Sequence, residues 1–298
     1  MACANQPRTN EADYFPIGQD TPESLLTKDL INTLKPDEAA SILFCGIGDA
    51  RNLFQTIIEF KGARPRNLHV AILDHNPAVI ARDLVLFRLL DEATAGDTTP
   101  DAHLLYYTIA YTYIVPVLPP FAWDGLQATI AAVLADLQSE KQPIPWVYVP
   151  TAHIKSVCRV LRQWQAEPKG PYSTKSVRAA VIKDRQTQPE SMPSMFSKAD
   201  EEFSHGFGTI ALPLSDTEKL EPRLGELLGA YRKSVKGSRS KLSAYINKTW
   251  RSNMTLIDVD WESTKEESET LGVTWDPFNG GTVGQVSRAR ITVHVPTW

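Results

Sequence analysis

The chain has 298 residues, a mass of 33.2 kDa and a net charge of −4, with 42% apolar and 22% charged residues; this excludes a chain disordered throughout and suits one large domain or two small ones. Its three cysteines are far apart and no Cys/His cluster has the spacing of zinc ligands, which argues against a disulfide framework and a structural metal. The N-terminal segment lacks a signal-peptide pattern and no apolar run reaches about 18 residues, so we expect a cytoplasmic protein without a membrane span.

Helical and strand-like segments alternate in the first hundred residues. Residues 1–20 are polar, and we expect a flexible arm. The apolar spacing then predicts, in chain order, a helix over Ser24–Leu34, a strand over Ala40–Phe44, a helix over Leu53–Phe60, a strand over Leu68–Leu73 and a helix over residues 78–93. Such alternation is typical of an α/β fold with a parallel sheet flanked by helices.

The second half of the chain predicts further helices and late strands. The residues His103–Leu118 suit either a helix or a strand. The other predicted elements are helices over Trp123–Leu137, residues 152–164 and Leu220–Ile246, the last with a break at Gly237-Ser238, and strands over Pro145–Val149, Thr255–Val259 and Arg290–Val295. We expect a core over residues 21–166, a mobile loop over 167–198, and a C-terminal α+β elaboration over 199–298 that packs on the same core.

A glycine turn follows the first predicted strand. The residues Gly46-Ile47-Gly48-Asp49 connect this strand to the next helix. Glycines let the backbone turn tightly and approach a ligand, and the following helix start offers unpaired N–H groups. In open parallel sheets ligands bind at this edge.

Asp74 ends the next strand, where a carboxylate can accept hydrogen bonds from ribose hydroxyls. We therefore predict a ligand pocket at this edge, with Asp49 and Asp74 as the catalytic candidates and Gly46, Gly48, Asn52 and Asn76 as ligand-binding residues. Two structural explanations stay open. A tight strand-to-helix turn needs glycine even without a ligand, and Asp74 or Asn76 can cap the helix that begins near Pro77.

Two basic segments are hidden by the small net charge. Residues 151–185 carry eight Lys and Arg against two acids, and seven Lys and Arg without an acid lie between Glu226 and Asp258. Each segment can be a solvated helix face. Because Tyr231, Tyr245 and Trp250 interleave with the second segment, we predict one continuous RNA-binding surface. Its candidate residues are Lys155, Arg159, Arg162, Arg232, Lys233, Lys236, Arg239 and Lys241.

Three segments that follow one another along the chain carry a family resemblance: YFPIG at residues 14–18, SILFCGIGDARNLF at 41–54 and LDHNPAVIARDLVLFRLL at 73–90. They resemble, in this order, the fungal family called domain of unknown function 4470, a module that also begins the third dynein axonemal assembly factor. The chain differs from the family pattern within the glycine turn, and Asp83 stands where the family has Asn. The resemblance implies a Rossmann-like, methyltransferase-like fold and no established activity.

Three functional classes are consistent with these features. An S-adenosylmethionine-dependent methyltransferase would explain the glycine turn and Asp74. Such enzymes usually have an acidic residue before the first glycine, where this chain has Cys45, whose thiol we expect to be buried. The spacing from Gly46 to Asp74 is also longer than the usual ~20 residues, and no Asn-Pro-Pro-aromatic motif occurs.

An aminoacyl-tRNA-dependent transferase would also explain the basic segments. Cyclodipeptide synthases are the compact Rossmann-like example, and the bacterial enzymes have G-x-S-x-x-N after the first strand, with the serine as nucleophile. Here Asp49-Ala50-Arg51-Asn52 follows the glycines and no serine is present. Asp49 would then bind an ammonium or guanidinium group or act as a base.

We expect this tRNA-dependent enzyme, acting on aminoacyl-tRNA and a small-molecule substrate and needing no cofactor. S-adenosylmethionine would be the cofactor of the methyltransferase alternative. A non-catalytic scaffold is the third possibility. His153, His205 and Trp275–Asn279 are weaker site candidates, which we expect to be structural.

Overall fold

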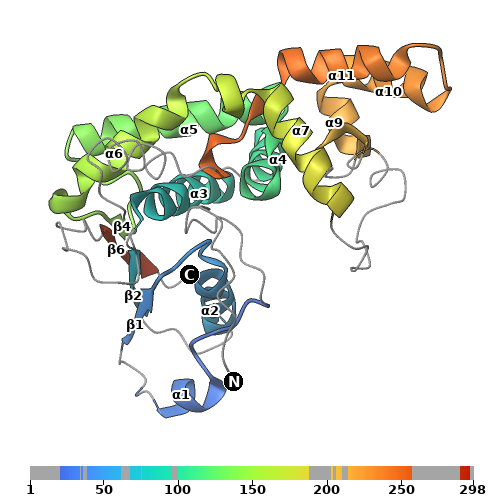
Figure 1. Cartoon of the computed structure of the whole chain (residues 1–298). Helices are drawn as coiled ribbons and strands as arrows, with labels where there is room; N and C mark the ends of the chain where they lie inside the picture. The colour runs from blue at the N-terminus through green and yellow to red at the C-terminus, as the bar shows by residue number, and fades with distance from the viewer. Residues whose placement is uncertain are drawn as a thin grey trace, which may run out of the picture.

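The computed structural model describes residues 21–33, 35, 39–61, 68–74, 76–95, 100–187, 203, 206–209, 214–256 and 289–295. Helices dominate the described residues (Figure 1). The helices are α1 (Lys28–Thr33), α2 (Arg51–Lys61), α3 (Pro77–Ala95), α4 (Pro100–Ile114), α5 (Pro120–Gln138), α6 (Thr151–Gln165), η1 (Gly170–Tyr172), α7 (Thr174–Thr187), α9 (Leu214–Leu220), α10 (Pro222–Arg232), α11 (Ser238–Thr249) and η2 (Met254–Leu256). The strands are β1 (Ala40–Cys45), β2 (Leu68–Asp74), β3 (Val117–Leu118), β4 (Val147–Tyr148), β5 (Arg251–Ser252) and β6 (Ala289–Val295).

The main sheet has the strand order β1-β2-β6-β4. β1 and β2 pair in parallel, as the alternation of strand, helix and strand predicts. β6 pairs antiparallel with both β2 and β4. Among the described strands the sheet is therefore mixed, and the prediction of a parallel sheet is right only for β1 and β2. The C-terminal strand enters the middle of the sheet, and an apolar strand pattern carries no information about strand direction.

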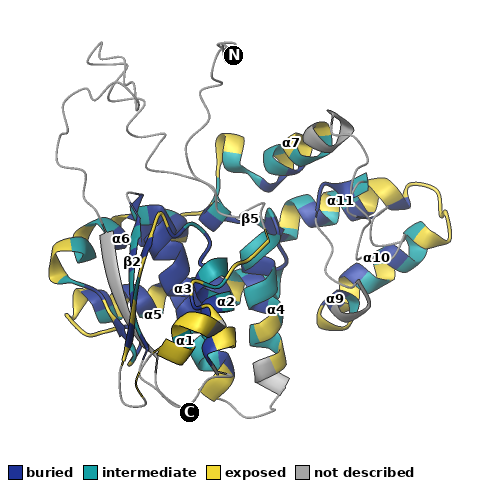
Figure 2. Cartoon of the chain, turned by 90° about the horizontal axis from the view of Figure 1, so that it is seen from below, coloured by how far each residue is buried: buried dark blue, intermediate teal, exposed yellow. Residues whose placement is uncertain are grey.

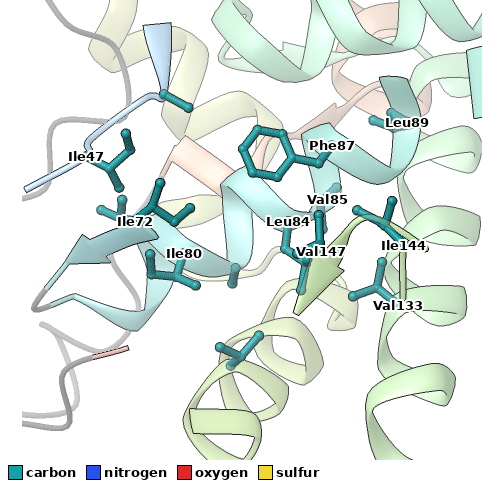
Figure 3. Packing of buried hydrophobic residues seen from close by; sticks show 14 of the residues in the cluster. Ile47, Ile72, Ile80, Leu84, Val85, Phe87, Leu89, Val133, Ile144 and Val147 are labelled. Atoms are coloured by element: carbon teal, nitrogen blue, oxygen red, sulfur yellow. The ribbon is translucent and has the colours of Figure 1, made fainter. Parts of the chain in front are cut away.

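Helix α3 is the centre of the core. It packs on β2 and β6 and against α4, α5 and α6, and the whole segment Ala78–Phe87 is buried. Figure 3 shows apolar side chains of the turn, β2, α3, α5 and β4 packed together, among them Ile47, Ile72 and Leu84. Burial of a charged side chain costs free energy, so the pair Arg82 and Asp83 in the middle of a helix that is buried on all sides is unusual.

A second, smaller core lies under α7, α10 and α11 (Figures 1 and 2). Its buried members include Phe207, Leu224, Leu242 and Trp250. The buried Arg178 of α7 stabilises this unit, because its guanidinium donates to the carbonyl of Phe207 at 2.6 Å and to the carbonyl of Ser243 at 3.2 Å.

Several predicted elements are found with small changes. His103–Leu118, which suits a helix or a strand by sequence, is mostly the helix α4, and a break between α10 and α11 falls at 233–237. The segment predicted as a mobile loop contains η1 and the helix α7, while residues 188–198 lie outside the described residues. Thr255 and Leu256 belong to η2 rather than to a strand. In the part of the chain that the structure describes, no helix is long and apolar enough to cross a membrane.

Candidate functional site

The glycine turn between β1 and α2 has an unusual backbone. Gly46, Gly48 and Ala50 have φ angles of 66°, 62° and 56°, all in the left-handed region. Glycine adopts such angles without strain, whereas Ala50 does not. No described heavy atom lies within 4 Å of a Cβ built on Gly46 or Gly48, apart from their chain neighbours. The glycines are thus required by the backbone angles and not by crowding, and the described residues leave open space beside the turn.

Asp74 lies against this turn, as the sequence predicts. Its Oδ2 is 3.5 Å from the amide nitrogen of Gly48, and its Oδ1 accepts the N–H of Asn76 at 2.9 Å. The side chain of Asn76 accepts the N–H of Ala78 at 2.8 Å, so Asn76 caps α3. Asp74 therefore joins the turn to the start of α3, and both side chains are buried.

Asp49 is held from two sides. Its Oδ2 accepts a hydrogen bond from the Tyr113 hydroxyl at 2.9 Å. On the other side, its Oδ1 accepts the N–H of Arg51 at 3.4 Å and lies 3.6 Å from the Arg51 Nε. Tyr113 belongs to the last turn of α4, so this contact connects the glycine turn with a residue 64 positions further along the chain.

Arg82 and Asp83 complete a buried polar cluster below the turn. The Arg82 Nη2 donates to the carbonyl of Tyr113 at 2.7 Å, and its guanidinium carbon lies 5.1 Å from the centre of the Tyr113 ring. The Nε and Nη1 atoms of Arg82 and both carboxylate oxygens of Asp83 are buried and have no hydrogen-bond partner among the described residues. Unfilled buried donors and acceptors of this kind are rare in folded proteins.

The cluster is rich in acids. We use the name turn cluster for Asp49, Asp74, Arg82, Asp83 and Tyr113. Burial raises the pKa of Asp83 well above its usual value, and the charges of Asp49 and Asp74 raise it further, whereas the charge of Arg82 lowers it. Burial and the Asp49 charge also raise the pKa of Tyr113. The turn cluster therefore favours a ligand group with positive charge or hydrogen-bond donors.

A metal ion is not the group that this cluster suits. Within the described part of the chain, no group of three or more His, Cys, Asp or Glu side chains is arranged to hold a metal ion. The three carboxylates of the turn cluster influence one another electrostatically, but they do not converge as ligands of one ion.

Asn52, one of the predicted ligand-binding residues, contacts the segment before α1. Its side-chain oxygen accepts the N–H of Glu23 at 2.9 Å, and the N–H of Leu25 binds the Thr56 hydroxyl at 3.1 Å. Asn52 thus attaches the segment before α1 to α2.

The expectation of a buried Cys45 thiol is wrong. Side chains alternate along β1, and Cys45 shares its exposed face with Ser41 and Leu43. His153 is half-buried at the start of α6, and burial lowers its pKa. His205 and Trp275–Asn279 lie outside the described residues.

The predicted continuous surface is not found for all of the candidates, because those on α6 lie apart from those on α10 and α11, whereas α7, the other helix of the first basic segment, packs against α11. Both views place α6 at one end of the molecule and α10 and α11 at the other (Figures 1 and 2). The candidates on α6, which are Lys155, Arg159 and Arg162, are exposed. Those at the α10–α11 end are exposed too; they are Arg232, Lys233, Lys236, Arg239 and Lys241. The sequence could not predict this separation of α6 from α10 and α11, because it does not reveal which helices become neighbours in the fold.

Not all charges of the α10–α11 end are equally available. Arg232 forms an ion pair of 2.7 Å with Glu218. Arg239 donates to the carbonyl of Gly206 at 3.2 Å and lies over the Phe207 ring. Lys233 and Lys236 lie in the exposed connection between the helices, and Lys241 lies on α11.

The aromatic residues of this segment are not available for base stacking. Trp250 is buried, and Tyr231 and Tyr245 are half-buried against the second core. The ring of Tyr231 packs edge-on against Phe207, with ring centres 5.3 Å apart. Any nucleic-acid contact here would rest on charge.

Tyr113 and Arg82 are site residues that the sequence did not predict. Tyr113 is separated from Asp49 by 64 positions, so no local pattern connects them. Arg82 and Asp83 did leave a signal, because a charged pair interrupts an otherwise apolar run in Ala78–Phe87.

Comparisons with known proteins support one of the expectations. Residues 16–115 match the family model described as Domain of unknown function (DUF4470). The resemblance to this domain family is therefore confirmed, and the matched segment includes all five residues of the turn cluster. No curated protein and no solved structure matches the chain.

Proposed function

We propose that the chain is a transferase that acts on aminoacyl-tRNA, with the turn cluster as its active site and peptide-bond formation of the cyclodipeptide synthase type as its reaction. The observation that carries the proposal is the excess of buried carboxylates beside an open glycine turn. An aminoacyl group offers what this site lacks, because its ammonium is a compact cation with hydrogen-bond donors.

Asp49 is the proposed base. It is the carboxylate of the turn itself, and the Tyr113 hydroxyl fixes its orientation. The amine of one aminoacyl group would give a proton to Asp49 and attack the ester carbonyl of a second one. The C–N bond forms, the C–O bond to the tRNA breaks, and the tRNA hydroxyl leaves with a proton. The remaining amine of the dipeptide then attacks the remaining ester carbonyl in the same way. This second step closes the ring, without a serine-linked intermediate and without a cofactor.

The α10–α11 end is the proposed contact with tRNA phosphates. It carries exposed lysines, and the segment from Leu227 to Leu256 contains no acidic residue. Lysine ammonium groups bind phosphates as point charges, which needs no precise geometry. A cytoplasmic location is part of the proposal, because aminoacyl-tRNA is made there.

A Rossmann-like fold is also part of the proposal. The unit β1–turn–α2–β2 with parallel pairing, and a carboxylate at the end of β2, supports it.

Replacement of Asp49 by asparagine tests the reaction. We expect expression of the wild-type protein in a tRNA-competent host to release cyclic dipeptides detectable by mass spectrometry, and Asp49→Asn to lower their amount by roughly 100-fold or more, because the base is lost. Glu59→Gln, an exposed change on the neighbouring helix α2, is the matched control. Equal product from both variants, or no product from the wild type, would refute the proposal.

Two charge variants test the tRNA contact. Lys233, Lys236 and Lys241 replaced by alanine, and Lys155, Arg159 and Arg162 replaced by alanine, each remove three positive charges, at opposite ends of the molecule. We expect the first variant to reduce the slope of log affinity against log salt by about 2 for tRNA, and the second to leave it nearly unchanged. Equal slopes for both variants would show nonspecific attraction and contradict the assignment of this end.

An S-adenosylmethionine-dependent methyltransferase is the second candidate. The contact of the Asp74 carboxylate with the glycine turn favours it, because a ribose would bind between these groups. Binding of S-adenosylmethionine without dipeptide release would support this candidate. A scaffold would show neither.

A further inference from the structure

Two adjacent residues of α3 have complementary unfilled groups. Asp83 has two oxygens without a hydrogen-bond partner and is 0% exposed, and Arg82 has two unpartnered nitrogens, Nε and Nη1, and is 1% exposed. A folded protein normally fills such groups, because each one loses its hydration on burial. The oxygens of Asp83 therefore need hydrogen-bond donors, and the two nitrogens of Arg82 need acceptors.

We infer that Arg82 and Asp83 bind the α-aminoacyl group of the substrate, with Asp83 accepting from the α-ammonium and Arg82 donating to the carbonyl oxygen. The inference rests on the proposed function and names the part of the substrate that the site recognises. An α-aminoacyl group carries an ammonium, which needs acceptors, and a carbonyl oxygen, which needs donors, and Asp83 and Arg82 offer one kind of group each. A free amino acid and the methionine part of S-adenosylmethionine present the same pair of groups.

The surroundings of the pair support this assignment. Asp83 lies close enough to Asp49 and Asp74 to be influenced by both charges, so these charges would also attract an ammonium bound to Asp83. Arg82 is fixed by its bond to the carbonyl of Tyr113, which leaves its other nitrogens in place for a ligand. Gly46 is exposed and Gly48 is half-exposed, so the turn is the side from which a ligand reaches the cluster.

A purely structural pair would have a different arrangement. Buried charges that stabilise a fold have their donors and acceptors filled, because an unfilled charge is destabilising. Arg178 provides the comparison within this chain, since its Nε and Nη1 atoms are used by Phe207, Ser243 and Asn247. Arg82 and Asp83 lack such partners among the described residues, and a bound ligand is one of the causes that leave buried polar groups unfilled in a ligand-free structure.

Binding measurements with defined probes test the inference. The probes are the twenty L-amino acids, their methyl esters, the corresponding desamino acids, and S-adenosylmethionine, each measured by calorimetry and by thermal shift. We expect at least one amino acid ester to bind the wild-type protein and its desamino counterpart to bind at least tenfold more weakly. Tighter binding of S-adenosylmethionine than of any ester would assign the aminoacyl group to the methyltransferase candidate. Absence of binding by every probe would overturn the inference and would indicate that ordered water fills the unpartnered groups of Arg82 and Asp83.

The variant Asp83→Asn separates recognition from folding. It keeps the shape of the side chain and replaces the carboxyl group, which a bound ammonium would hold ionised, by a neutral amide, so we expect at least tenfold weaker binding of the ester and an unchanged or higher melting temperature without ligand. Asp124→Asn, an exposed change on α5, is the control for both measurements. A lower melting temperature with unchanged affinity would show a structural carboxylate and overturn the inference. Normal binding by the wild type without dipeptide release would instead refute the proposed reaction and leave this inference standing.

Discussion

Replacement of Gly208 by alanine is expected to lower the free energy of unfolding by about 3 kcal/mol or more. Gly208 has a φ angle of 63°, and a Cβ on it would lie 2.5 Å from the carbonyl oxygen of Arg178 and 3.0 Å from the side chain of Ile182. The oxygen belongs to the backbone of α7 and cannot turn away. The alanine would therefore push Phe207 away from α7 and weaken the second core.

Gly237→Ala is the matched control for this prediction. Gly237 also has a left-handed backbone, with a φ angle of 76°, but in the described part of the chain no heavy atom other than those of its neighbours along the chain lies within 4 Å of its added Cβ. Only the backbone strain remains, which costs about 1 kcal/mol. Chemical denaturation of both variants measures the difference. Equal losses would show that the close approach of Gly208 to α7 does not exist in the folded protein.

The local part of the candidate site could be predicted from the sequence. The glycine turn, the strands β1 and β2 on either side of it and Asp74 are encoded within about 35 consecutive residues. A strand, a left-handed turn and a helix start each leave a short-range pattern. The contact of Asp74 with Gly48 also follows from the register, because the parallel pairing aligns Cys45, the residue before the glycine turn, with Leu73, the residue before Asp74.

The long-range part of the site could not be predicted. The bond between Tyr113 and Asp49 depends on how α4 packs against α3, and the spacing of residues does not encode helix packing. The direction of β6 was missed for the same reason, because an alternating strand pattern fits parallel and antiparallel pairing equally. The separation of α6 from α10 and α11 is likewise a property of the assembled fold (Figure 1).

Glu221 is the buried acid of the α10–α11 unit. It precedes α10 without capping it, it is 7% exposed, and its Oε2 accepts from the Tyr245 hydroxyl at 3.3 Å. Burial raises the pKa of Glu221 to about 7, because it outweighs the stabilisation of the carboxylate by the side chains of Tyr245 and Trp250. The folded protein therefore prefers this carboxyl group protonated.

This preference makes the stability of the protein depend on pH. The folded pKa of about 7 lies above the ordinary value of 4.5, so the folded state holds a proton that the unfolded state has lost. The stability that Glu221 contributes is fully present below pH 4.5 and is lost as the pH rises through 7. The loss amounts to about 2 to 3 kcal/mol, which corresponds to a melting temperature lower by roughly 4–10 °C.

Glu221→Gln tests this pH dependence, since glutamine is neutral at every pH. We expect the variant and the wild type to melt at similar temperatures at pH 4.5, and the variant to melt several degrees higher at pH 8. The control is Glu226→Gln, because Glu226 lies on the same helix α10, is exposed and pairs with Arg223; it should not change the pH dependence. Asp83 also has a raised pKa, but it is present in all three proteins, so the difference between the curves reports Glu221 alone. A constant offset between Glu221→Gln and the wild type from pH 4.5 to 8 would mean that Glu221 is charged in the folded protein. Charge on this buried side chain would then require a cation near α10, and Arg223 is the nearest arginine along the chain.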